Sequence, residues 1–182
     1  SAWTLLYVDS EQGGNPATSI FDNNNNSFWH TEYSPSNPVH PHEIRIDLGA
    51  NYFVTGFRYL PRQDSPNGRI SDYDFYVTND TTNWGSPQSS GTLSNNPGLQ
   101  EELFYTTSGR YIRLVATSEV NGNPWTSLAE LDVLQCINYA TETYVYNEIN
   151  TQTSNGSSTD DCYEITRTWE VTDYCGQVNT FT

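Results

Sequence analysis

The sequence consists largely of short runs in which apolar and polar residues alternate, each bounded by Gly, Pro, Asn or Asp. Alternation with a period of two is typical of half-buried β-strands, and a helical period is almost absent. We therefore expect strands at residues 3–8, 43–48, 53–60, 70–78, 101–106, 111–116 and 127–134. The connections between them are long and polar, which predicts a β-sandwich that carries its function on its loops.

Aromatic residues can supply the core of such a sandwich. The chain has 13 Tyr, 7 Phe and 5 Trp, so large side chains are available although only 35% of residues are hydrophobic. This content argues against intrinsic disorder. No run approaches the roughly 18 apolar residues of a membrane helix. The apolar stretch of a signal peptide is also missing, so we expect any export signal to lie outside this sequence.

Charge limits the partners of this chain. The formal net charge is −15, and all seven positive residues are Arg. A surface of this kind repels phosphate backbones and anionic lipid headgroups over a Debye length. We therefore expect no nucleic-acid partner, because affinity for nucleic acid depends largely on neutralised phosphates, and we regard a membrane as an unlikely partner.

The character of the sequence changes near Leu134. Residues 135–182 are rich in Thr, Tyr, Asn and Ser, with strand-like runs at 139–146 and 163–172. So short a segment buries little surface alone, and we expect two units, 1–134 and 135–182, the second a fragment. This segment holds all three cysteines, whose spacing suits an oxidised, extracellular setting better than a zinc site. We expect Cys162 to pair with Cys175, leaving Cys136 free or bonded elsewhere; a bridge from Cys136 to either is the alternative.

One loop has the composition of a metal site. The segment Ala17–His30 reads ATSIFDNNNNSFWH. Calcium takes six to eight oxygen ligands at about 2.3–2.6 Å, and this loop offers carboxylate, amide and main-chain oxygens. The alternative interpretation is a surface turn rich in Asn and Asp.

Several further motifs occur in an order typical of one family. Along the chain they read VDSEQ, ATSIFDNNNNSFWH, HEIRIDLG, VTGFRYLPRQDSPNGRISDYDFYVTND, GRYIRLVAT and NPWTSLAELDVL. From Ser1 to about Leu134 the chain resembles the discoidin (coagulation factor 5/8 type C) domain and, more closely, the family 32 carbohydrate-binding modules. The resemblance implies an all-β jelly-roll sandwich of the galactose-binding-domain-like kind, with a structural calcium beneath the ligand loops.

The resemblance also implies which residues hold the calcium. The ligands would come from the Asn-rich loop and the last strand: Ser19, Asp22, Asn24, Ser27, Ala129 and Glu130. Asn23 stands where the family usually has Gly, so a positive φ is expected at this position, and Asn tolerates a positive φ better than most residues. Asn24 stands where the family often has Asp, which removes one charge from the site.

A sugar site follows from the same resemblance. Its residues would be Glu11, His30, Tyr33, Arg62, Asn67 and Trp125. An aromatic ring stacks against the apolar C–H face of a sugar, while imidazole, guanidinium, amide and carboxylate groups bind its hydroxyls. The expected ligand is a galactose-configured sugar, whose axial 4-hydroxyl stands off the ring.

Each of these residues also has a structural interpretation. We expect Trp29 in the core. His30 could be a satisfied imidazole and Arg62 could form an ion pair with Asp64. His40 and His42 could bind a transition metal, but a loop entering the strand at residue 43 explains them better. No Ser/His/Asp order, nucleophile elbow or phosphate loop is present, so we expect no enzyme activity.

The last 20 residues or so contain CYEITRTWEVTDYCGQ, which resembles a repeat of secreted and surface proteins of the Bacteroidetes, of immunoglobulin-like or hyalin type. The sequence as a whole predicts a non-catalytic carbohydrate-binding module of a secreted or cell-surface protein. Such a module would hold a larger enzyme or adhesin on a polysaccharide. The alternatives are a protein-binding or cell-adhesion domain and a phospholipid-binding discoidin domain.

Overall fold

The computed structural model describes residues 3–136, 169–172 and 178–181. The chain divides into two compact units, Ser1–Cys136 and Ile137–Thr182. In the second unit, β9 (Trp169–Thr172) and β10 (Val178–Phe181) form an antiparallel pair. The strand expected at 139–146 lies outside the described residues, and the one expected at 163–172 is described only over β9.

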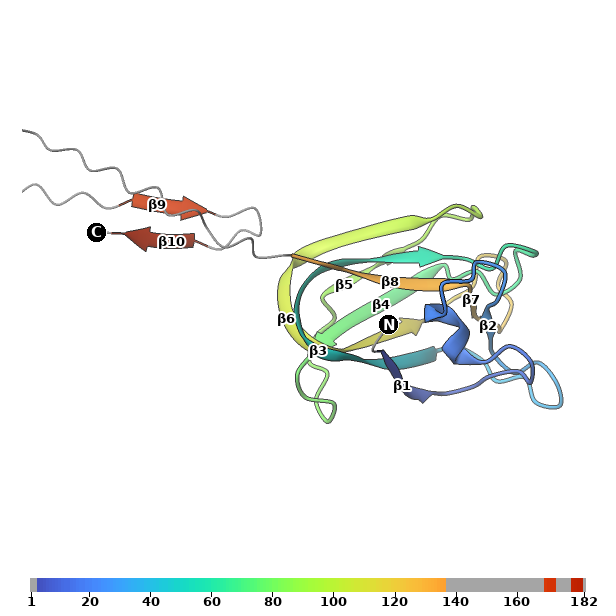
Figure 1. The fold of residues 1–182 in the computed structure, drawn as a ribbon. Coiled ribbons are helices and arrows are strands. Elements are labelled where there is room, and N and C mark those ends of the chain that lie inside the picture. Colours follow the sequence, from blue (N-terminus) through green and yellow to red (C-terminus); the bar gives the residue numbers. More distant parts are fainter. Residues whose placement is uncertain (1–2, 137–168, 173–177, 182) are drawn as a thin grey trace, which may run out of the picture. The chain divides into compact units, whose positions relative to one another are not determined.

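The first unit is built almost entirely from antiparallel strands (Figure 1). Over residues 3–136 the one helical element is the 3-10 helix η1, Ala17–Phe21. The strands are β1 (Thr4–Val8), β2 (Trp29–His30), β3 (His42–Leu60), β4 (Asp72–Thr78), β5 (Ser89–Thr92), β6 (Gln100–Ala116), β7 (Ser127–Leu128) and β8 (Glu130–Gln135). The main sheet has the order β1-β3-β6-β4-β5, and β8 pairs with β3.

Two long strands, β3 and β6, connect the two layers of the sandwich. The first half of β3 pairs with β1 and the second half with β8, while β6 pairs with β3 along both halves. The sequence predicted two strands in each of these regions, separated at residues 49–52 in the first and 107–110 in the second. The structure instead continues each strand through a bend, because the ladder shifts register between Asp47 and Tyr52 and resumes. A positive φ of 84° at Gly49 accommodates this bend.

The core lies between the two halves of the bent sheet. Phe57 on the second half of β3 stacks on Phe75 of β4, with ring centroids 4.3 Å apart. Trp29, only 1% exposed, belongs to the same cluster, as expected from the sequence. Aromatic pairs of this kind add about 0.5–1.5 kcal/mol beyond their buried area. The all-β jelly-roll sandwich expected from the sequence is thus confirmed.

The structure differs locally from the strand pattern expected from the sequence and decides between two possibilities for Cys136. Short β2 and β5 were not expected, because Ser89–Thr92 has no apolar alternation and Trp29–His30 is too short for a period to show. The strand expected at 127–134 is divided at Ala129, so that β7 pairs with β2 and β8 with β3. Cys136 is disulfide-bonded, so it is not free. Its partner lies outside the described residues, as do both cysteines of the expected pair.

Candidate functional site

The pairing of β2 with β7 builds the frame of the candidate site. His30 lies opposite Ser127 in this ladder. The pairing continues beyond β2, since the Thr31 N–H donates to the Thr126 carbonyl at 2.9 Å and the Thr126 N–H donates to the Thr31 hydroxyl at 3.0 Å. Trp125, which precedes Thr126, is therefore held beside His30 although 95 residues separate them in the sequence.

Three rings meet at this frame. The His30 ring centroid lies 5.2 Å from that of Tyr33 in an edge-on arrangement and 6.3 Å from that of Trp125. His30 is buried, Trp125 is half-buried, and Tyr33 is 51% exposed. The indole N–H of Trp125 donates to Oδ1 of Asn37 at 2.7 Å, which fixes the orientation of the ring. The structure thus brings together three of the residues expected in the sugar site.

His30 has one nitrogen occupied and one available. Its Nδ1 lies 2.6 Å from the Thr31 carbonyl, which can only accept a hydrogen bond. Burial lowers the pKa of His30, and the Arg62 charge lowers it further, although the Thr31 bond opposes them. A neutral ring that donates from Nδ1 has its proton there, so Nε2 is an acceptor. No described residue bonds to Nε2, which can therefore accept from a ligand hydroxyl.

Arg62 sits in the loop after β3. Its Nε and Nη2 donate to the two carboxylate oxygens of Asp64 at 2.7 and 2.9 Å, and its guanidinium lies 4.0 Å from the centroid of the Phe28 ring. The hydrogen bond from Arg62 holds the pKa of Asp64 below its usual range. The ion pair that we considered as an alternative is therefore present. It uses two of the five guanidinium N–H groups and leaves three for a ligand.

Asn67 is brought to the same frame by its backbone. Its carbonyl accepts from the Ser127 hydroxyl at 2.7 Å, and the carbonyl of Gly68 accepts from the Ser127 N–H at 2.7 Å. Gly68 has φ +82°, and a Cβ at this position would lie 2.7 Å from the Ser127 nitrogen. The loop therefore requires glycine to pack against β7. The Asn67 side chain is exposed, and no described residue bonds to it.

Glu11 is directed elsewhere. Its Oε2 accepts from the N–H of Ala17 at 2.9 Å, at the start of η1. Its neighbour Gln12 contacts the ring cluster instead, because Gln12 Oε1 accepts from the Tyr33 N–H at 3.0 Å and the Gln12 N–H donates to the His30 carbonyl at 2.8 Å. No described contact joins Glu11 to the rings.

Sequence reasoning missed three residues that support this site, Gln12, Phe28 and Asn37. Each contacts a group of the candidate site: Gln12 the Tyr33 backbone, Phe28 the Arg62 guanidinium and Asn37 the Trp125 indole. The available signal for Phe28 was its place beside Trp29. Gln12 and Asn37 carry no sequence signal, since polar residues in long loops are common.

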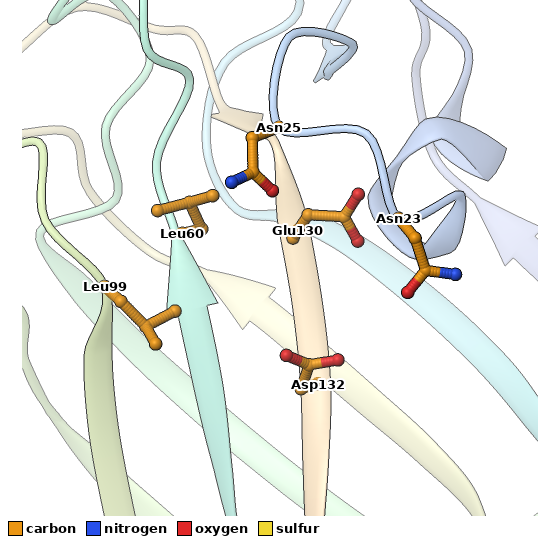
Figure 2. A pocket seen from close by; sticks show the side chains of 6 residues that line it. All are labelled: Asn23, Asn25, Leu60, Leu99, Glu130 and Asp132. Carbon is orange, nitrogen blue, oxygen red and sulfur yellow. The ribbon is translucent and has the colours of Figure 1, made fainter.

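The Asn-rich loop approaches the start of β8 (Figure 2). The N–H of Asn24 is shared by Oδ1 of Asp22 at 2.8 Å and Oε1 of Glu130 at 2.7 Å. The Ser27 hydroxyl donates to Oδ2 of Asp22 at 2.7 Å and lies 2.8 Å from the Asn24 carbonyl. Asn23 has φ 61°, the positive value expected from the sequence. The loop and the strand are thus joined through four of the six expected ligand residues.

This oxygen set fits a hard cation. Burial and the adjacent Asp22 carboxylate raise the pKa of Glu130 to about 7, because two like charges meet there. A divalent cation would relieve that repulsion, and the remaining oxygens are amide, hydroxyl and main-chain groups. The ligand atoms from Ser19 and Ala129 would be main-chain carbonyl oxygens; Ser19 is a buried residue in the middle of η1, and Ala129 directly precedes β8. Within residues 3–136, no group of three or more His, Cys, Asp or Glu side chains could hold a metal, so the neutral oxygens are essential.

Two surface hollows lie near these loops. One, of about 280 Å³, opens beside the metal loop and is lined by Asn23, Asn25, Leu60, Leu99, Glu130 and Asp132 (Figure 2). The other, of about 330 Å³, is lined by Asn26, Gln63 and Asp64. Neither lining includes the His30, Tyr33 or Trp125 rings.

A β-sandwich that gathers aromatic and polar side chains on its loops has the architecture of a ligand-recognition module. Residues 6–131 match the F5/8 type C domain, and the chain belongs to this family. Within the described residues, no helix has the length and apolarity to cross a bilayer.

The curated relatives are larger proteins. Over 139 residues the chain is 43% identical to galactose oxidase of Gibberella zeae, covering 75% of this chain and 20% of that protein. Over 134 residues it is 38% identical to a sialidase of Micromonospora viridifaciens, covering 71% of this chain and 21% of the sialidase. The chain therefore spans about a fifth of the length of these relatives.

Solved structures show the same fold. A family 32 module of Clostridium perfringens in complex with GalNAc-β-1,3-galactose superposes with a TM-score of 0.67 at 32% identity, covering 73% of this chain and 95% of that one. The family 32 module of C. perfringens NanJ in complex with galactose superposes with a TM-score of 0.64 at 29% identity, covering 72% and 93%. The first unit thus has the fold of the family 32 carbohydrate-binding modules.

Proposed function

We propose that the first unit is a non-catalytic carbohydrate-binding module for a galactose-configured sugar at the end of a glycan or polysaccharide. The observation that carries the proposal is the cluster of Trp125, Tyr33 and His30, in which two accessible rings flank an imidazole with an unoccupied acceptor. Two sugar complexes among the structural neighbours, one with galactose and one with a galactose-containing disaccharide, support it.

The chemistry assigns a role to each group. The C–H face of the sugar stacks on Trp125, and Tyr33 closes a second side. His30 Nε2 accepts from one hydroxyl, while Arg62 and Asn67 donate to its neighbours. An axial 4-hydroxyl lies off the ring plane, where groups standing beside the stacking face can reach it. So shallow a site has an expected Kd on the order of 0.1–1 mM, or about −4 to −5.5 kcal/mol.

Calcium is the second part of the proposal. Asp22, Asn24, Ser27 and Glu130, with main-chain oxygens of Ser19 and Ala129, would hold one ion that joins the Asn-rich loop to β8. The support is the shared Asn24 N–H and the raised pKa of Glu130, because two carboxylates converge there with no described positive side chain bonded to either. The ion would neutralise this pair and tie the loop down.

In the full protein the module would act through proximity. The matched relatives include enzymes in which a region like this chain makes up about a fifth of the length. We infer that this module belongs to a secreted protein and holds a catalytic or adhesive part on a glycan, which raises the effective concentration without new chemistry.

Titration calorimetry with galactose and glucose tests the sugar assignment. We expect galactose binding in the millimolar range or below and weaker glucose binding, because the equatorial 4-hydroxyl of glucose points away from the polar groups. Equal binding of both sugars would overturn the galactose assignment. Binding of anionic lipid vesicles with no response to any sugar would favour a phospholipid-binding discoidin domain instead.

A further inference from the structure

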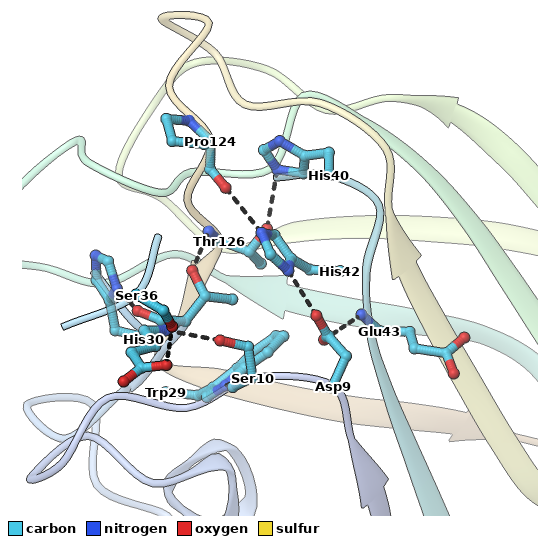
Figure 3. A network of polar contacts seen from close by, with 12 residues as sticks. Asp9, Ser10, Trp29, His30, Ser36, His40, His42, Glu43, Pro124 and Thr126 are labelled. Carbon is cyan, nitrogen blue, oxygen red and sulfur yellow. Dashed lines mark hydrogen bonds and ion pairs between the residues drawn. The ribbon is translucent and has the colours of Figure 1, made fainter. Parts of the chain in front are cut away.

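His42 begins β3, and its side chain is completely buried between two oxygen atoms (Figure 3). Nδ1 lies 2.7 Å from Oδ2 of Asp9, at the start of the loop after β1. Nε2 lies 2.7 Å from the carbonyl oxygen of Pro124. The ring therefore bridges two loops that are far apart in the sequence, and Pro124 is the residue directly before Trp125.

Both partners of this ring accept hydrogen bonds. A carbonyl has no proton to donate, and the other oxygen of Asp9 accepts from the Glu43 N–H at 2.7 Å. A neutral imidazole carries one N–H and satisfies only one of the two partners, whereas an imidazolium satisfies both. Burial opposes the charge, but the bonds to Asp9 and Pro124 outweigh it and raise the pKa of His42.

Other titratable groups face this ring. The His40 ring packs edge-on at 4.9 Å, and burial together with the His42 charge lowers the pKa of His40. His40 Nε2 lies 3.1 Å from the hydroxyl of Thr126, the residue that directly follows Trp125. Glu119 is buried at the start of the same loop, where it accepts from the Asn121 and Asn123 N–H groups, and its charge acts on His40. Asp9 is the only carboxylate among the described residues that bonds to His42 itself.

The chain just before and just after Trp125 is therefore held by β3 and its leading loop, Pro124 by His42 and Thr126 by His40. The indole N–H of Trp125 is bonded to Asn37. Thr126 is also held by its two hydrogen bonds with Thr31, whereas on the other side of Trp125 the Pro124 carbonyl is bonded to His42. Loss of the His42 proton would release one of the two acceptors, and a buried acceptor left unpaired is costly.

We propose that His42 is a positioning residue, held as an imidazolium between Asp9 and Pro124, that sets the Trp125 loop for ligand, so that ligand affinity falls as pH rises through the pKa of His42. The ligand part rests on the proposed function. The charged His42 ring is the form that bonds to both Asp9 and Pro124, and we call this pair of hydrogen bonds the His42 clamp. The clamp is intact below the pKa of His42 and is lost above it, so ligand affinity decreases with rising pH. The titration of His30 is separate from that of His42, because the pKa of His30 is lowered and that of His42 is raised.

The test uses Asp9→Asn. In this variant the side-chain oxygen of the introduced amide still accepts from the Glu43 N–H, so its NH₂ group faces Nδ1 of His42. Nδ1 must then accept a hydrogen bond, which leaves His42 neutral, with its single N–H at Nε2 donating to Pro124. In the whole chain, imidazole ¹⁵N shifts should show both His42 nitrogens protonated at neutral pH, and only one in the variant. Asp80→Asn, an exposed loop carboxylate that is bonded to Thr82, is the matched control and should behave as the wild type.

Galactose titrations across pH complete the test. The wild-type affinity should fall about three- to tenfold, with a midpoint at the His42 pKa, and this step should be missing in Asp9→Asn. A neutral His42 ring at neutral pH would overturn the proposal, as would a flat affinity profile across a measured His42 titration.

A second readout separates this proposal from the proposed function. The Trp125 indole N–H resonance should shift with the His42 titration even when no sugar is present. If galactose fails to bind at any pH, the sugar assignment is wrong, but this resonance still shows whether the protonation of His42 positions Trp125. An indole signal that ignores the His42 titration overturns the proposal. If Asp9→Asn does not fold, the wild-type curves alone decide.

Discussion

The indole of Trp125 is held by two neighbouring side chains. Asn37 fixes the ring nitrogen, and the His30 ring lies beside it. A ring that is already ordered loses little conformational entropy on binding, so more of the stacking energy appears as affinity. Single side chains in this site thus depend on neighbours that do not touch the ligand.

Replacing Trp125 with Ala should weaken galactose binding by about 0.5–1.5 kcal/mol from lost stacking, with a further loss of buried area. Titration calorimetry measures the change. Tyr105→Ala is the matched control, because Tyr105 is 97% exposed on β6, outside the ligand loops. Equal losses in both variants would contradict a specific stacking role for Trp125.

Arg62 should not tolerate Lys. The guanidinium makes a two-point contact with Asp64 while lying on the Phe28 ring, and an ammonium cannot reproduce this fork. We expect Arg62→Lys to lose nearly as much galactose affinity as Arg62→Ala, about 1.5–3 kcal/mol, the usual contribution of a charged donor. Calorimetry on both variants checks this, and full affinity in Arg62→Lys would show that charge alone is sufficient.

At the scale of elements, the loops depend on a few backbone conformations. The loop after η1 turns at Asn23, the one non-glycine residue with positive φ among the described positions. The long strands depend on paired charges across the bend, where Arg110 on β6 donates to both carboxylate oxygens of Asp47 on β3 at 2.8 Å. Each feature predicts a different response to substitution.

Asn23→Ala should destabilise the protein by about 1 kcal/mol, because Ala adopts positive φ at a steric cost, whereas Asn23→Gly should retain the loop. Thermal melts in saturating calcium measure both variants against the wild type. Gly is the matched control here, since both variants remove the same amide side chain. Equal melting temperatures for the two would show that the φ of this residue is unimportant.

The Asp47–Arg110 pair should make a pH-dependent contribution. The hydrogen bond from Arg110 lowers the pKa of Asp47, so its contribution to stability is present above the ordinary carboxyl pKa and is lost as pH falls through the depressed one. Arg110→Gln should therefore be less stable than the wild type at neutral pH and equal to it in strong acid. Urea unfolding across pH measures this, and high salt should shrink a difference that comes from an exposed pair.

At the scale of the whole molecule, the Asn-rich loop and β8 bring together residues more than a hundred positions apart, as Asn24 and Glu130 show. A metal bound only by the folded state stabilises the entire cooperative unit, because unfolding must release it. The proposed calcium site therefore predicts an effect on the stability of the whole folded unit.

Chelation with EDTA should lower the melting temperature by about 5–15 °C, which corresponds to roughly 2.7 kcal/mol for an ion present at a hundred times its Kd. Added calcium should restore the melting temperature of the wild type. Asp22→Asn should melt lower and respond little to either treatment. An unchanged melting temperature after chelation would contradict the calcium proposal.

The sequence by itself determined the architecture and selected three residues, His30, Tyr33 and Trp125, that the structure brings together. Alternation predicted an all-β sandwich because the faces of a strand follow from local backbone geometry, which each short segment carries by itself. The positive φ at Asn23 was implied by the family resemblance, because the family usually has Gly at this position. His30, Tyr33 and Trp125 could be selected because their motifs occur in the order of a known family.

Only the tertiary structure decided which distant side chains meet. The pairs Asn37 with Trp125, Phe28 with Arg62 and His42 with Pro124 join loops that no sequence period connects. The bend that merges the expected strands near Gly49 also depends on the register between β3 and β6. Such contacts arise when the whole chain packs, since a polar loop residue has many local conformations and its partner is selected by the rest of the fold.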